Sequence, residues 1–184
     1  MRKVRREDIV DYQTWSDRRD QERPRILEIK RPRRVHVGDH LTFLFENTDT
    51  VRYQIQEMMR VERIVRESDI QHEIDTYNEL LGDDGELGCV LLIEIDDPAV
   101  RDVKLREWID LPRRLYAELE DGTRVRATYD PRQIGDERLS SVQYLKFDVR
   151  GRVPVALGSD LPELTVRATL DEAQRQALAD DLKA

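Results

Sequence analysis

The sequence predicts an α+β fold with a largely antiparallel sheet, helices in the N-terminal half and a C-terminal helix. Two observations support this prediction. Before Gly82, apolar residues recur every three or four positions in several stretches, which is the helical period. After residue 114, alternating apolar and polar stretches are separated by short turns, which is typical of hairpins. Early helices followed by hairpins favour an α+β fold.

The chain is expected to consist of a basic N-terminal helix and arm, residues 1–34, and a single α+β domain, residues 35–184. A first helix is predicted over residues 7–22, where apolar side chains recur at intervals of three: Ile9, Tyr12 and Trp15. Arg23-Pro24 is expected to end it, because proline lacks the backbone N–H that a helix interior needs. The remainder of the arm is then a link or irregular segment.

Residues 35–46 alternate in the manner of a strand, with Gly38-Asp39 marking a bend or a bulge. The polar residues that follow can cap a helix, which is predicted over about residues 50–66. A shorter helix is predicted over about residues 70–81, and the turn residues after it end it.

Residues 87–95 form the most apolar run of the chain, with apolar side chains at both parities. Such a run is expected to be a central strand that is covered on both faces. Asp97-Pro98 then predicts the start of a helix with proline at the first helical position. This helix is expected to end before Leu111-Pro112.

The next segment contains the clearest indication of strand pairing. A two-residue turn at Asp121-Gly122 would place the apolar residues of one strand opposite the charged residues of the other. A three-residue loop, Glu120-Asp121-Gly122, instead pairs Ala117 with Val125. The type I turn with a glycine bulge has this loop length and is therefore favoured.

Three later strands are expected, over residues 141–149, 153–157 and 164–170. The first two are predicted to form a hairpin across Arg150-Gly151-Arg152. A terminal amphipathic helix is predicted over residues 171–182, after a stretch with capping-box spacing.

Composition excludes several classes of protein. No stretch approaches 18 uncharged apolar residues, so no membrane partner is expected. The basic N-terminus is not followed by an apolar region, which argues against a secretory signal. The single cysteine, Cys89, leaves no internal disulfide and lies in an apolar run, where a buried, inert thiol is expected. These features predict a soluble, cytoplasmic protein.

Charge is distributed unevenly along the chain. Residues 1–34 hold 12 Lys and Arg against 7 Asp and Glu, whereas the remainder holds 19 against 32. The basic segment suits an intramolecular latch or a solvated surface. Nucleic acid is not favoured as a partner, because the acidic body would repel phosphates. A protein partner or a small molecule remains open, as does the oligomeric state.

The helix expected after residue 50 carries the most distinctive polar pattern. Glu62 occupies an apolar position of a helical stripe formed by Val51, Ile55, Met58 and Val65. One interpretation places Glu62 at the rim of the core with its carboxylate in water. The other makes it a semi-buried carboxylate that lines a cleft and is held by Arg52, His40 or Tyr77. The candidate polar site comprises seven residues: Glu46, Arg52, Tyr53, Gln56, Glu57, Glu62 and Tyr77.

No metal and no cofactor is expected. His36 and His40 are four residues apart, about 13 Å in an extended strand, so only a tight turn between them would allow joint chelation. Asp69 and His72 form one imperfect acid-x-x-His pair, whereas a di-iron bundle needs two such motifs and further glutamates. No phosphate-binding loop, nucleophile elbow or zinc helix is present.

Several short motifs resemble an uncharacterised bacterial family, domain of unknown function number 3501. They are Leu44–Asn47, Tyr53–Met58, Glu73, Tyr77–Leu81 and Val142–Phe147. The resemblance covers nearly the whole chain and supplies no activity, cofactor or catalytic residue. Members of that family are often encoded near rubrerythrin and an iron–sulphur oxidoreductase, which implies a role near redox or peroxide defence by association only.

The leading interpretation is therefore an accessory or binding protein without chemistry of its own. The alternative is an enzyme or small-ligand-binding protein that uses a polar cleft around the Tyr53–Glu62 helix. A large concave pocket with Glu62 facing into it would favour the alternative, and a flat surface would favour the first.

Overall fold

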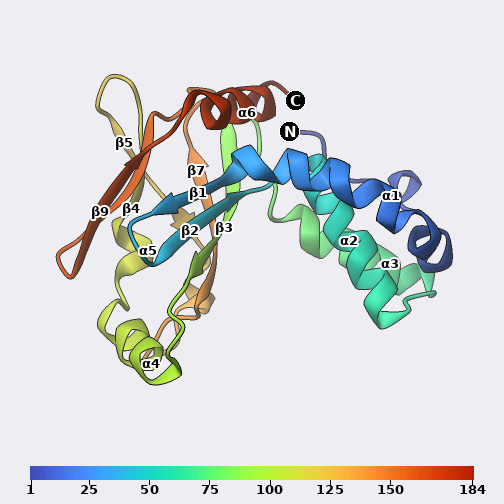
Figure 1. Cartoon of the computed structure of the whole chain (residues 1–184), viewed down its shortest axis with the longest axis horizontal. Helices are drawn as coiled ribbons and strands as arrows, with labels where there is room; N and C mark the ends of the chain where they lie inside the picture. The colour runs from blue at the N-terminus through green and yellow to red at the C-terminus, as the bar shows by residue number, and fades with distance from the viewer.

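The structure, a computed structural model, describes residues 1–184. They form a helical lobe and a sheet lobe (Figure 1). The helical lobe holds a short 3₁₀ helix, η1, and three α-helices, α1 to α3. Their bounds are Arg6–Asp8, Tyr12–Lys30, Thr48–Glu62 and Glu67–Asn78. A separate apolar cluster holds this lobe together: Val4, Ile9, Val51, Ile55, Met59, Ile70, Ile74 and Leu81. None of the helices is long and apolar enough to cross a membrane.

The sheet lobe contains nine strands in two antiparallel sheets. The five-stranded sheet has the order β1 (Arg34–Val37), β2 (Leu41–Phe45), β3 (Glu86–Ile93), β7 (Val142–Asp148) and β6 (Thr128–Tyr129). The four-stranded sheet has the order β5 (Arg124–Arg126), β4 (Leu115–Glu118), β8 (Ala156–Leu161) and β9 (Leu164–Thr169). The fold is therefore α+β with antiparallel sheets, as the sequence predicts.

The two sheets enclose the main apolar core, to which both contribute alternate residues. The chain passes from β5 to β6 at the buried Ala127, which joins the sheets along one side. On the other side, Val166 of β9 lies so close to Gly38 that a Cβ there would come within 2.8 Å of a Val166 methyl group. Two helices, α4 (Pro98–Glu107) and α5 (Leu111–Arg114), and the C-terminal α6 (Glu172–Lys183) complete the lobe.

The predicted hairpin is confirmed. Ala117 pairs with Val125, and the Leu119 N–H donates to the Thr123 carbonyl at 2.8 Å. Residues 120–122 therefore form a three-residue loop, in which Gly122 adopts a φ of 81°.

Three predictions about other elements are wrong. The first helix runs through Pro24 to Lys30, because α1 packs along α2 and buries Ile26 beyond the proline. Gly38-Asp39 is the turn of a hairpin, with Val37 paired to Leu41, and not a bend within one strand. No hairpin joins the strands expected at 141–149 and 153–157, because β7 and β8 belong to different sheets.

Other elements agree with prediction. The helix starting at Pro98 is capped by Asp97, and β3 is the central strand of its sheet. One face of β3 lies in the core, whereas Val90 and Leu92 on the other face are only half-buried. The terminal helix is present, but its capping box is formed by Asp171 and Gln174. The expected division of the chain at residue 34 stays a prediction.

A buried ion pair lies where the two lobes meet. Arg33 donates from Nε and one Nη to the two carboxylate oxygens of Asp181, each at 2.8 Å. Asn47, which caps α2, donates from its side chain to the same carboxylate at 3.1 Å. The pair thus connects the 3₁₀ helix that follows α1 (Arg31–Arg33), the start of α2 and helix α6.

Candidate functional site

The candidate residues from the sequence do not form a single cleft. Gln56 and Glu57 join α2 to the N-terminal segment. Gln56 is 2% exposed, and its amide bonds the backbone N–H and carbonyl of Val10 at 2.8 and 3.0 Å. Glu57 accepts hydrogen bonds from Trp15 at 2.8 Å and from Arg19 at 2.9 Å. Both residues therefore stabilise the packing of α2 against the N-terminal segment.

Burial alone would raise the pKa of the Glu57 carboxyl. Hydrogen bonds from Trp15, Arg60 and Arg19 outweigh this effect and hold the pKa below its ordinary value. The carboxylate is therefore ionised at neutral pH and fully engaged in joining α1 to α2.

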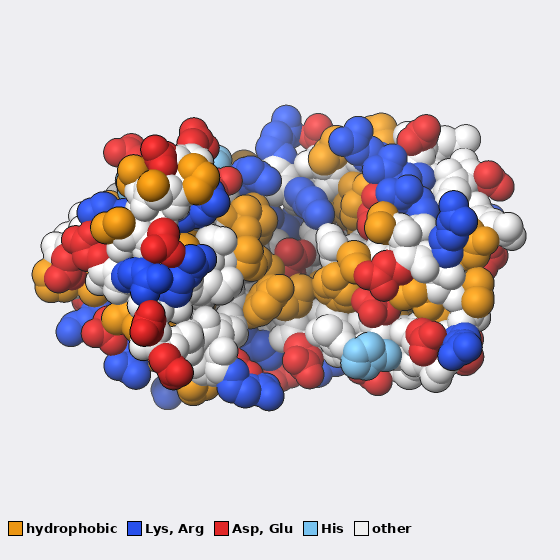
Figure 2. Space-filling view, turned by 90° about the horizontal axis from the view of Figure 1, so that it is seen from below, with side chains coloured by type: hydrophobic (Ala, Val, Ile, Leu, Met, Phe, Trp, Pro, Cys, Tyr) orange, Lys and Arg blue, Asp and Glu red, His pale blue; other side chains and the backbone are white.

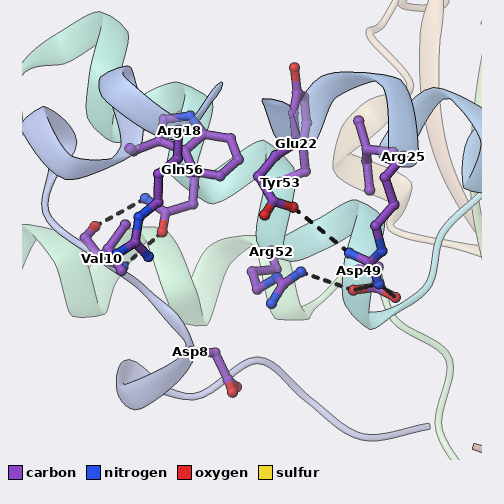
Figure 3. Close-up of a pocket in the computed structure, with 11 residues that line it drawn as sticks. Asp8, Val10, Arg18, Glu22, Arg25, Asp49, Arg52, Tyr53 and Gln56 are labelled. Carbon is purple, nitrogen blue, oxygen red and sulfur yellow. Dashed lines mark hydrogen bonds and ion pairs between the residues drawn. The ribbon is translucent and has the colours of Figure 1, made fainter. Parts of the chain in front are cut away.

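Arg52 and Tyr53 line a small cavity of about 110 Å³ between α1 and α2 (Figure 3). Its charged groups neutralise one another, since Asp49 accepts from Arg52 at 3.1 Å and from Arg25 at 3.5 Å. The Tyr53 ring lies edge-on to Trp15, with centroids 5.6 Å apart. The cavity is too small for most ligands, and its charged residues other than Arg18 already have partners.

Glu62 is exposed, so the interpretation that places its carboxylate in water is confirmed and the one that makes it semi-buried is wrong. It is the last residue of α2, and the helix ends at Arg63, which adopts the left-handed conformation. The buried stripe passes instead through Val51, Ile55 and Met59. The helix ends before Val65, which is 70% exposed, so the stripe proposed from the sequence does not extend that far.

Glu46 lies half-buried between β2 and α2, where it accepts a hydrogen bond from the Thr50 hydroxyl. Burial raises the pKa of its carboxyl, although the Thr50 hydrogen bond and the charges of Lys30 and Arg33 oppose this effect. Burial and the nearby Glu46 charge also raise the pKa of the Cys89 thiol well above its ordinary value. Cys89 is buried and therefore remains a thiol, as expected.

Besides an exposed hollow of about 480 Å³ beside Glu62, a hollow that includes a predicted residue lies between the two lobes. This interlobe cleft has a volume of about 450 Å³, and its walls come from the end of α3, from β6 and β7, and from the 3₁₀ helix η3 (Pro131–Gln133). Figure 2 shows the hollow between the lobes, with hydrophobic side chains on its walls. Tyr77 of the predicted set lines it, together with Leu80, Tyr129 and Tyr144.

Two features of β7 position the cleft residues. Leu145 and Phe147 point into the core, so Tyr144 and Lys146 point to the opposite face, toward the cleft. The Gln133 side chain accepts from the Tyr144 N–H at 2.6 Å and donates to the Tyr144 carbonyl at 3.2 Å. The Gln133 amide therefore forms the two hydrogen bonds that a neighbouring strand would form, and it holds the Tyr144 backbone in place.

The electrostatic environment of Tyr77 reflects both walls. Burial raises the pKa of its hydroxyl, a hydrogen bond with Gln54 opposes this, and Glu73, Tyr144 and Glu62 add to the increase. The hydroxyl is therefore protonated at neutral pH and can donate to a ligand.

Sequence reasoning found Tyr77 but missed the opposite wall of the cleft. Tyr144 alternates with inward-facing residues, so the pattern identifies it as outward-facing. The pattern does not show which element lies opposite it. Its proximity to α3 depends on how the lobes pack, which no local pattern records.

The histidines are engaged separately. Nδ1 of His36 lies 2.9 Å from the Thr42 hydroxyl, and Nδ1 of His40 lies 3.4 Å from the Glu94 carbonyl. No group of three or more His, Cys, Asp or Glu side chains lies close enough to hold a metal ion.

Comparison with known proteins places the chain in a family. A crystal structure of a novel protein of unknown function from Burkholderia pseudomallei K96243 is similar, with a TM-score of 0.89 and 30% sequence identity. The match covers 98% of this chain and 100% of the other. No curated protein matches significantly. Residues 3–182 match the family described as protein of unknown function (DUF3501), and the chain therefore belongs to that family.

Proposed function

We propose that the protein binds a small organic ligand in the interlobe cleft and performs no chemistry on it. The observation that carries this proposal is the cleft itself, at about 450 Å³. Ligand sites typically occupy 300–1,000 Å³, are mostly apolar, and hold a few polar groups that orient the ligand. The cleft combines aromatic rings with Gln133, Lys146 and hydroxyl groups in this way.

Binding is favoured over catalysis by the chemistry of the lining. Cys89 contributes to the wall, but its thiol is buried and its pKa is raised, so it is a poor nucleophile. None of the three histidines lines the cleft, which therefore lacks the usual general base at neutral pH. The accessory role beside redox proteins, implied by the family resemblance, is compatible with ligand binding and stays a prediction.

A neutral fluorescent dye, N-phenyl-1-naphthylamine, tests this proposal. The wild-type protein should enhance its fluorescence with saturation at one equivalent. Tyr144→Ala should weaken binding about fivefold, because it removes a ring worth about 1 kcal/mol of contact. Tyr144 is 49% exposed, so the fold should survive the change.

Val103→Ala provides the matched control, because Val103 is 61% exposed on α4 and does not line the cleft. It should leave dye affinity unchanged. Equal dye affinity in the wild type and in the Tyr144→Ala variant, with unchanged melting midpoints, would contradict the proposal.

A further inference from the structure

The interlobe cleft presents tyrosine side chains from both lobes. Tyr77 comes from α3, whereas Tyr129 and Tyr144 come from β6 and β7. Aromatic faces carry negative electrostatic potential and attract organic cations within about 6 Å of the ring centroid. Several rings around one cavity are the usual arrangement for recognising ammonium groups.

Among the charged side chains that line the cleft, only Glu79 has no ion-pair partner. Glu79 lines the cleft, and Glu73 lies one turn before Tyr77 on the same face of α3. Neither carboxylate, nor that of Glu62, lies within 4.0 Å of a Lys, Arg or His nitrogen.

The three cations beside the cleft already have partners. Arg113 donates to the Tyr129 hydroxyl at 3.1 Å and to Asp110 at 3.0 Å. Lys146 lies 3.7 Å from Glu86. Arg132, at the rim, donates to Asp130 from Nε at 2.8 Å and from an Nη at 2.5 Å. These pairs offset their own charges, and the Glu79 carboxylate stays without an ion pair within 4.0 Å, although the charge of Arg132 interacts with it at longer range.

We infer that the ligand is a small organic cation with apolar substituents, held by the three tyrosines and by the carboxylate of Glu79 at the end of α3. This inference rests on the proposed function, because it names the ligand class of the same cleft. An anionic ligand would meet the unpaired carboxylate of Glu79 and would have to compete with Glu86 for Lys146. A neutral ligand would gain nothing from the Glu79 carboxylate.

Choline and 3,3-dimethylbutan-1-ol provide a direct test, because they have the same shape and differ in the charge at one atom. Saturation-transfer NMR should show choline binding about tenfold more tightly at low ionic strength, which matches a cation–π and ion-pair gain of about 1.4 kcal/mol. Sodium chloride should be added to the alcohol samples to equalise ionic strength.

Glu79→Gln should weaken choline binding about threefold to tenfold and leave the alcohol unaffected. Glu163→Gln makes the same change of charge in the turn between β8 and β9, far from the cleft in sequence and outside its lining, and should change neither affinity. Equal affinity for choline and the alcohol, or an equal loss in both variants, would overturn the inference.

The two proposals fail in different ways. Dye binding that depends on Tyr144, without any preference for choline over the alcohol, would overturn the inference that the ligand is a cation. The proposal that the cleft is the ligand site would stand. Dye binding that is insensitive to Tyr144 would overturn the cleft as the ligand site, and with it the cation inference.

Discussion

At the residue scale, Glu57 joins α1 to α2 through hydrogen bonds from Trp15 and Arg19. Glu57→Gln should reduce the free energy of unfolding by about 1–2 kcal/mol, since a charged acceptor is replaced by a neutral one. Glu28→Gln is the control, because Glu28 forms an exposed pair with Arg31 and should leave stability unchanged.

The Glu57 effect should depend on pH. The folded-state pKa is lowered, so the carboxylate contributes stability above its unfolded pKa of about 4.3 and loses it as pH falls through the folded value. Urea unfolding should show a constant difference between wild type and Glu57→Gln above about pH 5 and a shrinking difference below about pH 4. A difference that grows on acidification would contradict the assignment.

Glu62 should prove to be an ordinary surface residue. It is exposed at the end of α2, and no side chain lies in hydrogen-bonding contact with it. Glu62→Leu should therefore change the free energy of unfolding by less than about 0.5 kcal/mol. A loss of more than about 1 kcal/mol in urea unfolding would show that a partner had been left unpaired.

At the element scale, the loop at residues 120–122 isolates a backbone effect. Gly122 has a φ of 81°, and a Cβ there would meet no heavy atom within 4 Å. Gly122→Ala should therefore cost about 1 kcal/mol through backbone strain alone. Gly122→Asn should cost less, because asparagine tolerates the left-handed region. Equal losses in thermal melts of the two variants would argue against this explanation.

Elements were predictable where local pattern and tertiary structure agree. The hairpin from Leu115 to Ala127 follows from parity and loop length, which are both local. Helix α1 could not be predicted past Pro24, because packing against α2 stabilises its second half. The hairpin expected after Val149 does not form, because β8 pairs with β4 and β9 and so belongs to the other sheet. These pairings cannot be read from the residues around Val149 alone.

At the scale of the whole molecule, the Arg33–Asp181 pair should determine how firmly the lobes are joined. Both side chains are at least 90% buried. Asp181→Ala should cost about 3–5 kcal/mol, because it leaves a buried arginine without its partner. Combining Arg33→Met with Asp181→Leu should restore part of that loss. A double variant less stable than Asp181→Ala would contradict this expectation.

The candidate site shows the same limit of sequence reasoning. Four of the predicted polar residues, Arg52, Tyr53, Gln56 and Glu57, lie where α2 meets the N-terminal segment, and only Tyr77 reaches the interlobe cleft. The cleft exists because the end of α3 and the outward face of β7, more than 60 residues apart in the sequence, lie opposite each other. Such a site arises from the arrangement of the two lobes, and no local sequence motif indicates it.

The most direct test of the cation-binding cleft is an NMR titration of protein with ¹³C-labelled tyrosine rings. The chain has six tyrosines, of which three line the cleft. Added choline should shift the ring signals of Tyr77, Tyr129 and Tyr144 with one common affinity. The signals of the three others, Tyr12, Tyr53 and Tyr116, should stay in place. Shifts centred on Tyr53, shifts spread evenly over all six rings, or no shift at all would contradict the account.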